Sequence, residues 1–159
     1  MAQYTDLSKL IQSVVKQLGS TNHNSTHLKD EVADTMRNVI LDDVYAKFTP
    51  EEYQRRGDDG GFSDTDNMVF TDVQTIGNQI NLTFENITEG NDSMSGEKIA
   101  EMFEKGNGKW DKEVTDDKGR LNTDPRPFIE DTVIELNRNK DKLINATKKD
   151  LKNKGFDVK

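Results

Sequence analysis

The sequence of 159 residues contains no cysteine, which excludes disulfide bonds, thiolate metal sites and a cysteine nucleophile. Long hydrophobic runs are also missing, because the longest purely aliphatic run is the short stretch Val39–Leu41. A membrane-spanning helix needs about 20 apolar residues, so we expect none in this chain. The N-terminus lacks the basic and then apolar order of a signal peptide, and we therefore expect no secretory leader.

Apolar residues are scarce throughout the chain. Hydrophobic residues make up 31% of the sequence and charged residues 33%. Even with the 11 glycines added, the apolar share stays below the usual ~45–50%. The length fits a single domain, but the material for its core is thin. We therefore expect part of the chain to be extended, or to gain its burial from neighbouring subunits.

The net charge of −8 is distributed unevenly along the sequence. Residues 138–159 contain eight basic and three acidic residues and so carry +5, which leaves −13 for the remaining 137 residues. An acidic body with a basic tail favours head-to-tail contact between identical subunits, although any single lysine is more typical of a solvated helix face. The overall acidity argues against a general nucleic-acid binder, because such binding depends on phosphate neutralisation.

The sequence pattern predicts four helices and three strands. Apolar residues three and four positions apart predict helices over 7–18, 26–46 and 97–105. Alternating residues predict strands over 68–75 and 80–86, joined by a hairpin turn at Gly77-Asn78. The segment Pro125–Ile129 opens a last helix that ends at Gly155, and a short strand is predicted over 156–158.

These elements place the chain in the α+β class, with N-terminal helices, a small antiparallel sheet, a short central helix and a long C-terminal helix. We interpret residues 1–159 as a single domain. Its sections are the N-terminal helices (1–48), a Gly-rich loop (49–67), a sheet region with the short helix and a long loop (68–124), and the C-terminal helix and tail (125–159).

The chain carries few residues that suggest chemistry. The motifs of serine hydrolases, P-loops and dinucleotide-binding folds are absent from the sequence. The two histidines, His23 and His27, are four residues apart, so on a helix they would share a face and could begin a zinc site with Asp30 or Glu31. Their polar surroundings are more typical of a solvated linker. We therefore predict no enzyme, no cofactor and no metal site, with a metal-dependent hydrolase as the alternative from another class.

Three segments in this order resemble a known family. The first runs from Tyr45 through Tyr53–Arg56 to Gly60–Phe62, the second is Phe103–Gly106, and the third is Pro125–Ile129. Together they are similar to the tail-completion, or head–tail joining (neck), proteins of tailed bacteriophages. The resemblance extends from about Leu7 to the last helix.

That resemblance implies a non-enzymatic virion subunit that assembles as a ring at the neck or upper tail. Its partners would be copies of itself and other neck or tail proteins, with DNA passing through an acidic lumen without specific binding and with no membrane partner. It would be found in the virion, and in the host cytoplasm during assembly. A tail terminator or a minor capsid protein of the same fold is the runner-up, and a soluble monomeric adaptor is a further alternative.

Charged and aromatic residues near these segments are the candidates for contacts between subunits. Arg55 and Arg56 could pair with a carboxylate of a neighbour, and the few aromatic side chains suit core or interface anchors. The predicted interface residues are Arg55, Arg56, Tyr53, Gly60, Gly61, Phe62, Trp110, Arg126 and Phe128.

Overall fold

The computed structural model describes residues 7–46, 56–89, 96–105 and 125–158. The helices are α1 (Leu7–Gly19), α2 (His27–Val39), α3 (Gly96–Lys105), α4 (Phe128–Arg138) and α5 (Lys140–Asn153), with the short turns η1 (His23–Ser25), η2 (Ile40–Tyr45) and η3 (Thr65–Asn67). The strands β1 (Met68–Ile76) and β2 (Gln79–Asn86) form an antiparallel hairpin. The predicted α+β class is confirmed.

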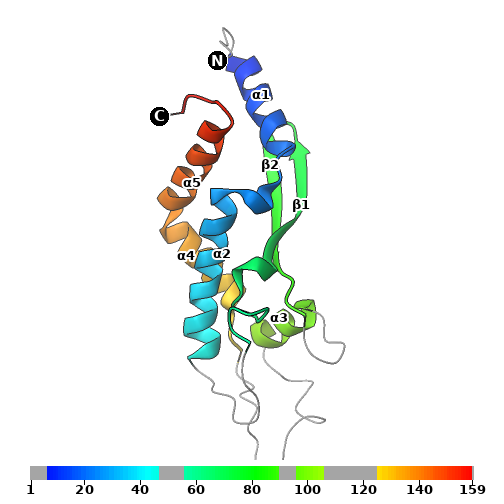
Figure 1. Cartoon of the computed structure of the whole chain (residues 1–159), viewed down its shortest axis with the longest axis vertical. Coiled ribbons are helices and arrows are strands. Elements are labelled where there is room, and N and C mark those ends of the chain that lie inside the picture. Colours follow the sequence, from blue (N-terminus) through cyan, green and yellow to red (C-terminus); the bar gives the residue numbers. More distant parts are fainter. Residues whose placement is uncertain (1–6, 47–55, 90–95, 106–124, 159) are drawn as a thin grey trace, which may run out of the picture.

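Helix α2 lies in the middle of the molecule, with α4 and α5 on one side and the hairpin on the other (Figure 1). Its apolar face forms most of the core together with Ile40, the first residue of η2: Ala33 and Ile40 are completely buried, and Met36 and Val39 nearly so. The same face continues through the π-helical turn η2, where Val44 is buried. The predicted helix over 26–46 is therefore present, with its last turn widened.

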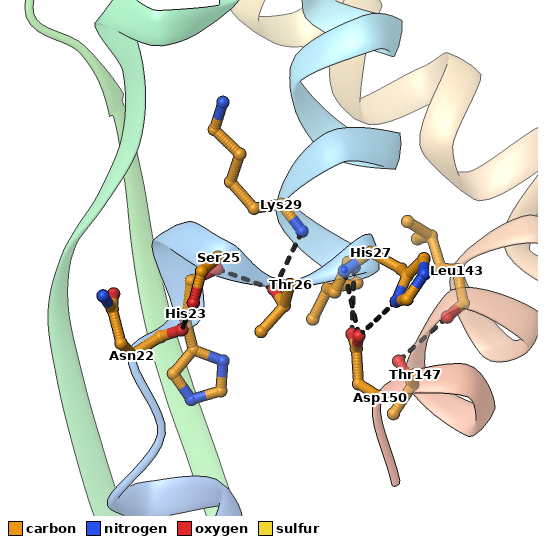
Figure 2. A network of polar contacts seen from close by, with 10 residues as sticks. Asn22, His23, Ser25, Thr26, His27, Lys29, Leu143, Thr147 and Asp150 are labelled. Atoms are coloured by element: carbon orange, nitrogen blue, oxygen red, sulfur yellow. Dashed lines mark hydrogen bonds and ion pairs between the residues drawn. The ribbon is translucent and has the colours of Figure 1, made fainter. Parts of the chain in front are cut away.

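A buried carboxylate from the other end of the chain holds the N-terminus of α2 (Figure 2). Asp150 of α5 accepts hydrogen bonds from the backbone N–H groups of His27 (2.9 Å) and Leu28 (3.0 Å), and from Nδ1 of His27 (2.7 Å). The Thr26 hydroxyl accepts the next N–H, that of Lys29, at 3.2 Å. Three of the N–H groups that a helix start leaves unpaired are thus satisfied, and a negative charge faces the positive end of the helix dipole.

The hairpin matches the predicted strands, but the two faces of β1 are not those that its sequence suggests. Thr71 is an extra residue, because the register shifts between Phe70, which pairs with Phe84, and Asp72, which pairs with Thr83. A bulge of this kind reverses the alternation of side chains beyond it. Phe70 and Val73 consequently lie on the same face of the hairpin, although three positions separate them.

Helix α1 and the outer part of the hairpin, residues 71–82, form an extension that we call the arm; it lies at one end of the molecule (Figure 1). Within the described residues, α1 contacts both strands of the hairpin. Gly19 at its end lies against Thr75, where an added Cβ would be only 2.6 Å from the threonine Oγ1. No described side chain of α1 is fully buried, so the arm has an incomplete apolar layer.

Two predictions about the C-terminal segment need correction. The predicted single helix is two helices, because Asn139 (φ −107°, ψ 28°) leaves the helical conformation between α4 and α5. The predicted strand over 156–158 is wrong: these residues have no regular structure, and the Phe156 N–H instead donates to the carbonyl of Leu151 (3.1 Å) after Gly155, whose φ is +86°.

Within the described ranges, no helix has both the length and the apolar character needed to cross a bilayer.

Replacing Asp150 with alanine should lower the free energy of unfolding by roughly 2 kcal/mol, because two helix-start N–H groups and a histidine lose a charged acceptor. Chemical denaturation monitored by circular dichroism measures this. The matched control is Asp157→Ala, which removes an exposed carboxylate and should cost less than about 0.5 kcal/mol. Similar losses in the two variants would show that Asp150 does not hold α2.

Candidate functional site

The three segments that carry the family resemblance meet at one junction. Phe62 lies in the Gly-rich loop, directly after Gly60 and Gly61, Phe103 lies in α3, and Phe128 is the first residue of α4. The ring centroid of Phe62 is 5.1 Å from that of Phe103 and 5.2 Å from that of Phe128. Such distances are typical of favourable aromatic pairs. Phe62 and Phe128 are buried, so residues far apart in the sequence form one aromatic cluster beneath the loop.

Arg126 ties the third segment to the other two. Its guanidinium lies over the ring of Phe103, with 5.7 Å from Cζ to the centroid, and its Nη1 donates to the Val44 carbonyl at 3.4 Å. That carbonyl belongs to the last turn of its helix, where backbone acceptors lack helical partners. The Arg126 backbone N–H also donates to the Phe103 carbonyl at 2.7 Å. The side chain is buried, so the arginine acts as an internal connector.

A second link joins α3 to the start of α4. The Ile129 backbone N–H donates to Oε2 of Glu104 at 3.0 Å, so a carboxylate lies at the positive end of the α4 dipole. Glu104 belongs to the second resemblance segment and Ile129 to the third.

The Gly-rich turn requires glycine at two positions for different reasons. Gly60 has a φ of +70°, a conformation that side chains disfavour. A Cβ on Gly61 would lie 2.4 Å from the carbonyl oxygen and 2.6 Å from the nitrogen of Gly57. Asp64 closes the turn, because its Oδ2 accepts the Gly60 N–H at 2.8 Å.

Buried polar side chains fix this turn to the hairpin. The Gly61 carbonyl accepts hydrogen bonds from Oγ1 of Thr88 (3.1 Å) and Nδ2 of Asn67 (3.2 Å). Nδ2 of Asn86 donates to the Phe62 carbonyl at 2.8 Å. Thr88 and Asn86 are buried and hydrogen-bonded to each other at 2.6 Å. A satisfied buried network of this kind specifies one conformation of the loop.

At the rim of the junction, Arg37 of α2 forms a two-pronged ion pair with Asp58. The distances are 2.7 Å from Nη2 to Oδ2 and 3.2 Å from Nε to Oδ1. The hydrogen bond from Arg37 holds the pKa of Asp58 below its usual range, and the same bond raises the pKa of Arg37. The Ser63 hydroxyl donates to the same carboxylate at 3.3 Å.

The structure changes the interpretation of several predicted interface residues. The side chains of Phe62, Arg126 and Phe128 are buried within the subunit, as is Gly61, so they build the junction and are not exposed for a neighbour. Arg56 is exposed and donates to the carbonyl of Glu89, and its interface role stays a prediction, as does that of Gly60. The remaining candidates, Tyr53, Arg55 and Trp110, lie outside the described residues.

The two histidines do not share a helix face. His23 lies in η1, where it is buried and its Nε2 donates to the Leu18 carbonyl at 2.8 Å, whereas His27 begins α2 and donates to Asp150 (Figure 2). The zinc pairing suggested by their spacing is therefore wrong. In the part of the chain that the structure describes, no three His, Asp or Glu side chains are grouped in a way that could hold a metal ion.

Sequence reasoning missed Asp150 and the buried polar pair Asn86 and Thr88. One signal for Asp150 was present, because it falls on the apolar face of its helix together with Leu143 and Ala146. A charge on such a face requires a partner, and the partner here is the start of α2. Asn86 and Thr88 carry no comparable signal.

Comparison with known proteins identifies one relationship. The model of the family described as YomN matches residues 5–153. The family is phage-derived, with YomN itself coming from a Bacillus prophage. No curated protein and no solved structure matches the chain.

Substituting Gly61 with alanine should lower the free energy of unfolding by about 2 kcal/mol or more, because the new Cβ would collide with the backbone of Gly57. Gly77→Ala is the control: Gly77 also has a positive φ (+60°), but nothing lies within 4 Å of its Cβ position. Gly77→Ala should lower the free energy of unfolding by only roughly 1–2 kcal/mol, which is what the left-handed conformation costs a residue with a Cβ. If the Gly77 variant lost as much stability as the Gly61 variant, steric contact would not be the cause.

Replacing Arg37 with glutamine should raise the pKa of Asp58 toward its usual value of about 3.9, which NMR titration of its carboxyl group measures. Because the folded-state pKa is lowered, the pair stabilises the protein above the ordinary carboxyl pKa, and that contribution disappears as pH falls through the folded value. Arg37→Lys keeps the charge without the two-pronged geometry and should give a smaller rise. An unchanged Asp58 titration in the glutamine variant would contradict the ion pair.

Proposed function

The chain belongs to the YomN family, and from this premise we propose that it is a structural virion protein of a phage, placed at the head–tail interface. In this role it completes the tail or connects it to the neck, and it assembles with copies of itself as a ring around the DNA channel. It makes and breaks no covalent bond. Its other partners are the neck and tail proteins above and below the ring.

The observation that carries this proposal is the meeting of the three resemblance segments. Phe62, Phe103 and Phe128 are separated by 41 and 25 positions, yet their rings form one cluster, and Arg126 and Glu104 add polar links within it. Unrelated segments that matched a family by chance would have no reason to meet. A shared junction instead supports a fold element common to this chain and the tail-completion proteins.

Exposed apolar and basic side chains on α4 and α5 are suited to contacts around a ring. Ile129 and Val133 are one helical turn apart on α4 and are 44% and 51% exposed. On α5, Lys149 and Lys152 are exposed, and a neighbouring subunit offers exposed carboxylates such as Asp30. A head-to-tail contact that joins these surfaces repeats from copy to copy and closes as a ring. It would also supply burial that the thin core lacks.

The charge of the chain is compatible with DNA passage. A net charge of −8 gives a ring lumen that repels the phosphate backbone, so DNA passes without being held. The same arrangement would serve a tail terminator or a minor capsid protein of this fold. The position of the chain in the particle separates these alternatives from a neck or tail-completion protein.

Deleting the gene from the phage that encodes this chain should produce filled heads and separate tails, which electron microscopy of lysates detects. Wild-type protein supplied in the same cells should restore joined particles and appear at the neck in cryo-EM maps. Normal tailed particles from the deletion, or virions that lack the chain, would contradict the proposal. Tails of uncontrolled length would favour the tail terminator.

The ring contact has its own test. Val133→Asp should abolish rescue in the deletion strain and reduce the mass of assemblies seen by native mass spectrometry, because a charge enters an apolar contact. Ile87→Asp is the matched control, since Ile87 is 47% exposed and lies outside α4 and α5. Circular dichroism verifies that both variants fold. Equal rescue by the two variants would exclude this surface from the ring.

A further inference from the structure

The two outer edges of the hairpin differ. The side-chain amide of Asn24 covers the edge of β1, because its Nδ2 donates to the Phe70 carbonyl at 3.0 Å and its Oδ1 accepts the Phe70 N–H at 2.6 Å. Asn24 thereby takes the place of a neighbouring strand. The bulge at Thr71 adds a second obstacle on the same edge. Both features are devices that prevent an edge strand from pairing with another chain.

No described residue protects the edge of β2 in this way. In an antiparallel pair, two opposite residues either bond to each other or both direct their backbone groups outward. The backbone N–H and carbonyl of Phe70 point outward to Asn24, so those of its partner Phe84 point outward on the other edge of the hairpin. The backbone groups of Leu82 and Ile80 do the same, because the direction alternates along a strand. Within the described residues, no hydrogen bond reaches these outward groups from another element. The strand contains no lysine, proline or bulge.

We propose that β2 pairs antiparallel with β2 of a second copy of this chain, centred on Leu82, to form a four-stranded sheet. Extended backbone is the chemistry that satisfies such an edge. This register places Ile80 opposite Phe84 of the second copy, an aromatic and β-branched pair that stabilises sheets. It places Glu85, the only charged residue of β2, opposite Gln79, so no like charges meet. The strand is thus complementary to itself.

The half-exposed arm supports the same partner. Helix α1 contacts both strands of its hairpin, and none of its described aliphatic side chains (Leu10, Ile11, Val14, Val15 and Leu18) is fully buried. In the paired sheet, the two copies of α1 lie on one face, two strand spacings apart. That separation is roughly 9.6 Å, within the 8–10 Å at which helices pack. Pairing therefore covers the apolar side of α1 as well as the strand edge.

This contact is separate from the ring contact proposed for α4 and α5. It is isologous, so the same surface is used by both copies and it closes on a pair. It requires neither a ring nor a virion, and its failure would leave the proposed function untouched.

Two double variants test the pairing, because Asn81 of one copy lies opposite Thr83 of the other. Asn81→Lys with Thr83→Lys brings like charges together twice and should weaken association roughly tenfold or more. Asn81→Lys with Thr83→Glu brings opposite charges together twice and should associate at least as tightly as the wild type. Both positions are exposed on the outer face, so folding should be retained, which circular dichroism verifies.

Sedimentation velocity over a concentration series measures the association. The control variant, Gln74→Lys with Ile76→Lys, adds the same charge one strand away from the contact and should associate like the wild type. A wild-type chain that remains a single subunit at all concentrations would overturn the proposal. So would equal association of the two β2 variants, because a contact elsewhere would not distinguish the sign of residue 83.

Discussion

A single buried carboxylate brings together two segments that are far apart in the sequence. Asp150 places α5 against the start of α2, across 123 positions of sequence, and α4 directly precedes α5. Helix α4 in turn begins with Phe128, which packs in the aromatic cluster with Phe62. The position of the Gly-rich turn therefore depends on a series of contacts that begins with Asp150 at the start of α2 and ends with Phe128 against Phe62. With so few apolar residues, specific polar contacts carry much of the organisation that a larger core would provide.

Local patterns predicted the elements well, because helix and strand periods leave direct marks in the sequence. The helix over 7–18 and the hairpin turn at Gly77-Asn78 were found in this way, and α1 and the hairpin confirm them. The faces of β1 could not be predicted, since the bulge at Thr71 is set by pairing with β2. The helix break at Asn139 also gave no signal, because apolar residues continue across it.

The candidate site was predicted in part. The three resemblance segments were identified from sequence, with their aromatic side chains predicted as core or interface anchors, and Phe62, Arg126 and Phe128 are buried within the subunit. Whether an aromatic residue in a loop anchors its own chain or a neighbour depends on contacts far along the sequence. Among the described residues, Phe62 and Phe128 are buried, whereas aliphatic side chains such as Val133 are exposed on α4.

The extra residue in β1 gives the arm a tolerance for a change in chain length. Because Thr71 is extra, Phe70 and Val73 lie on the same face of the hairpin, and Thr75 on that face lies next to Gly19 at the end of α1. Substitutions on the polar outer face leave this geometry intact. Deleting Thr71 would make Phe70 and Asp72 consecutive, opposite the consecutive residues Phe84 and Thr83, so Asp72 and Val73 would keep their faces and only the bulge would be lost. The arm should therefore keep its faces when one residue is lost at this point of β1, but it would lose an obstacle that keeps other strands from the β1 edge.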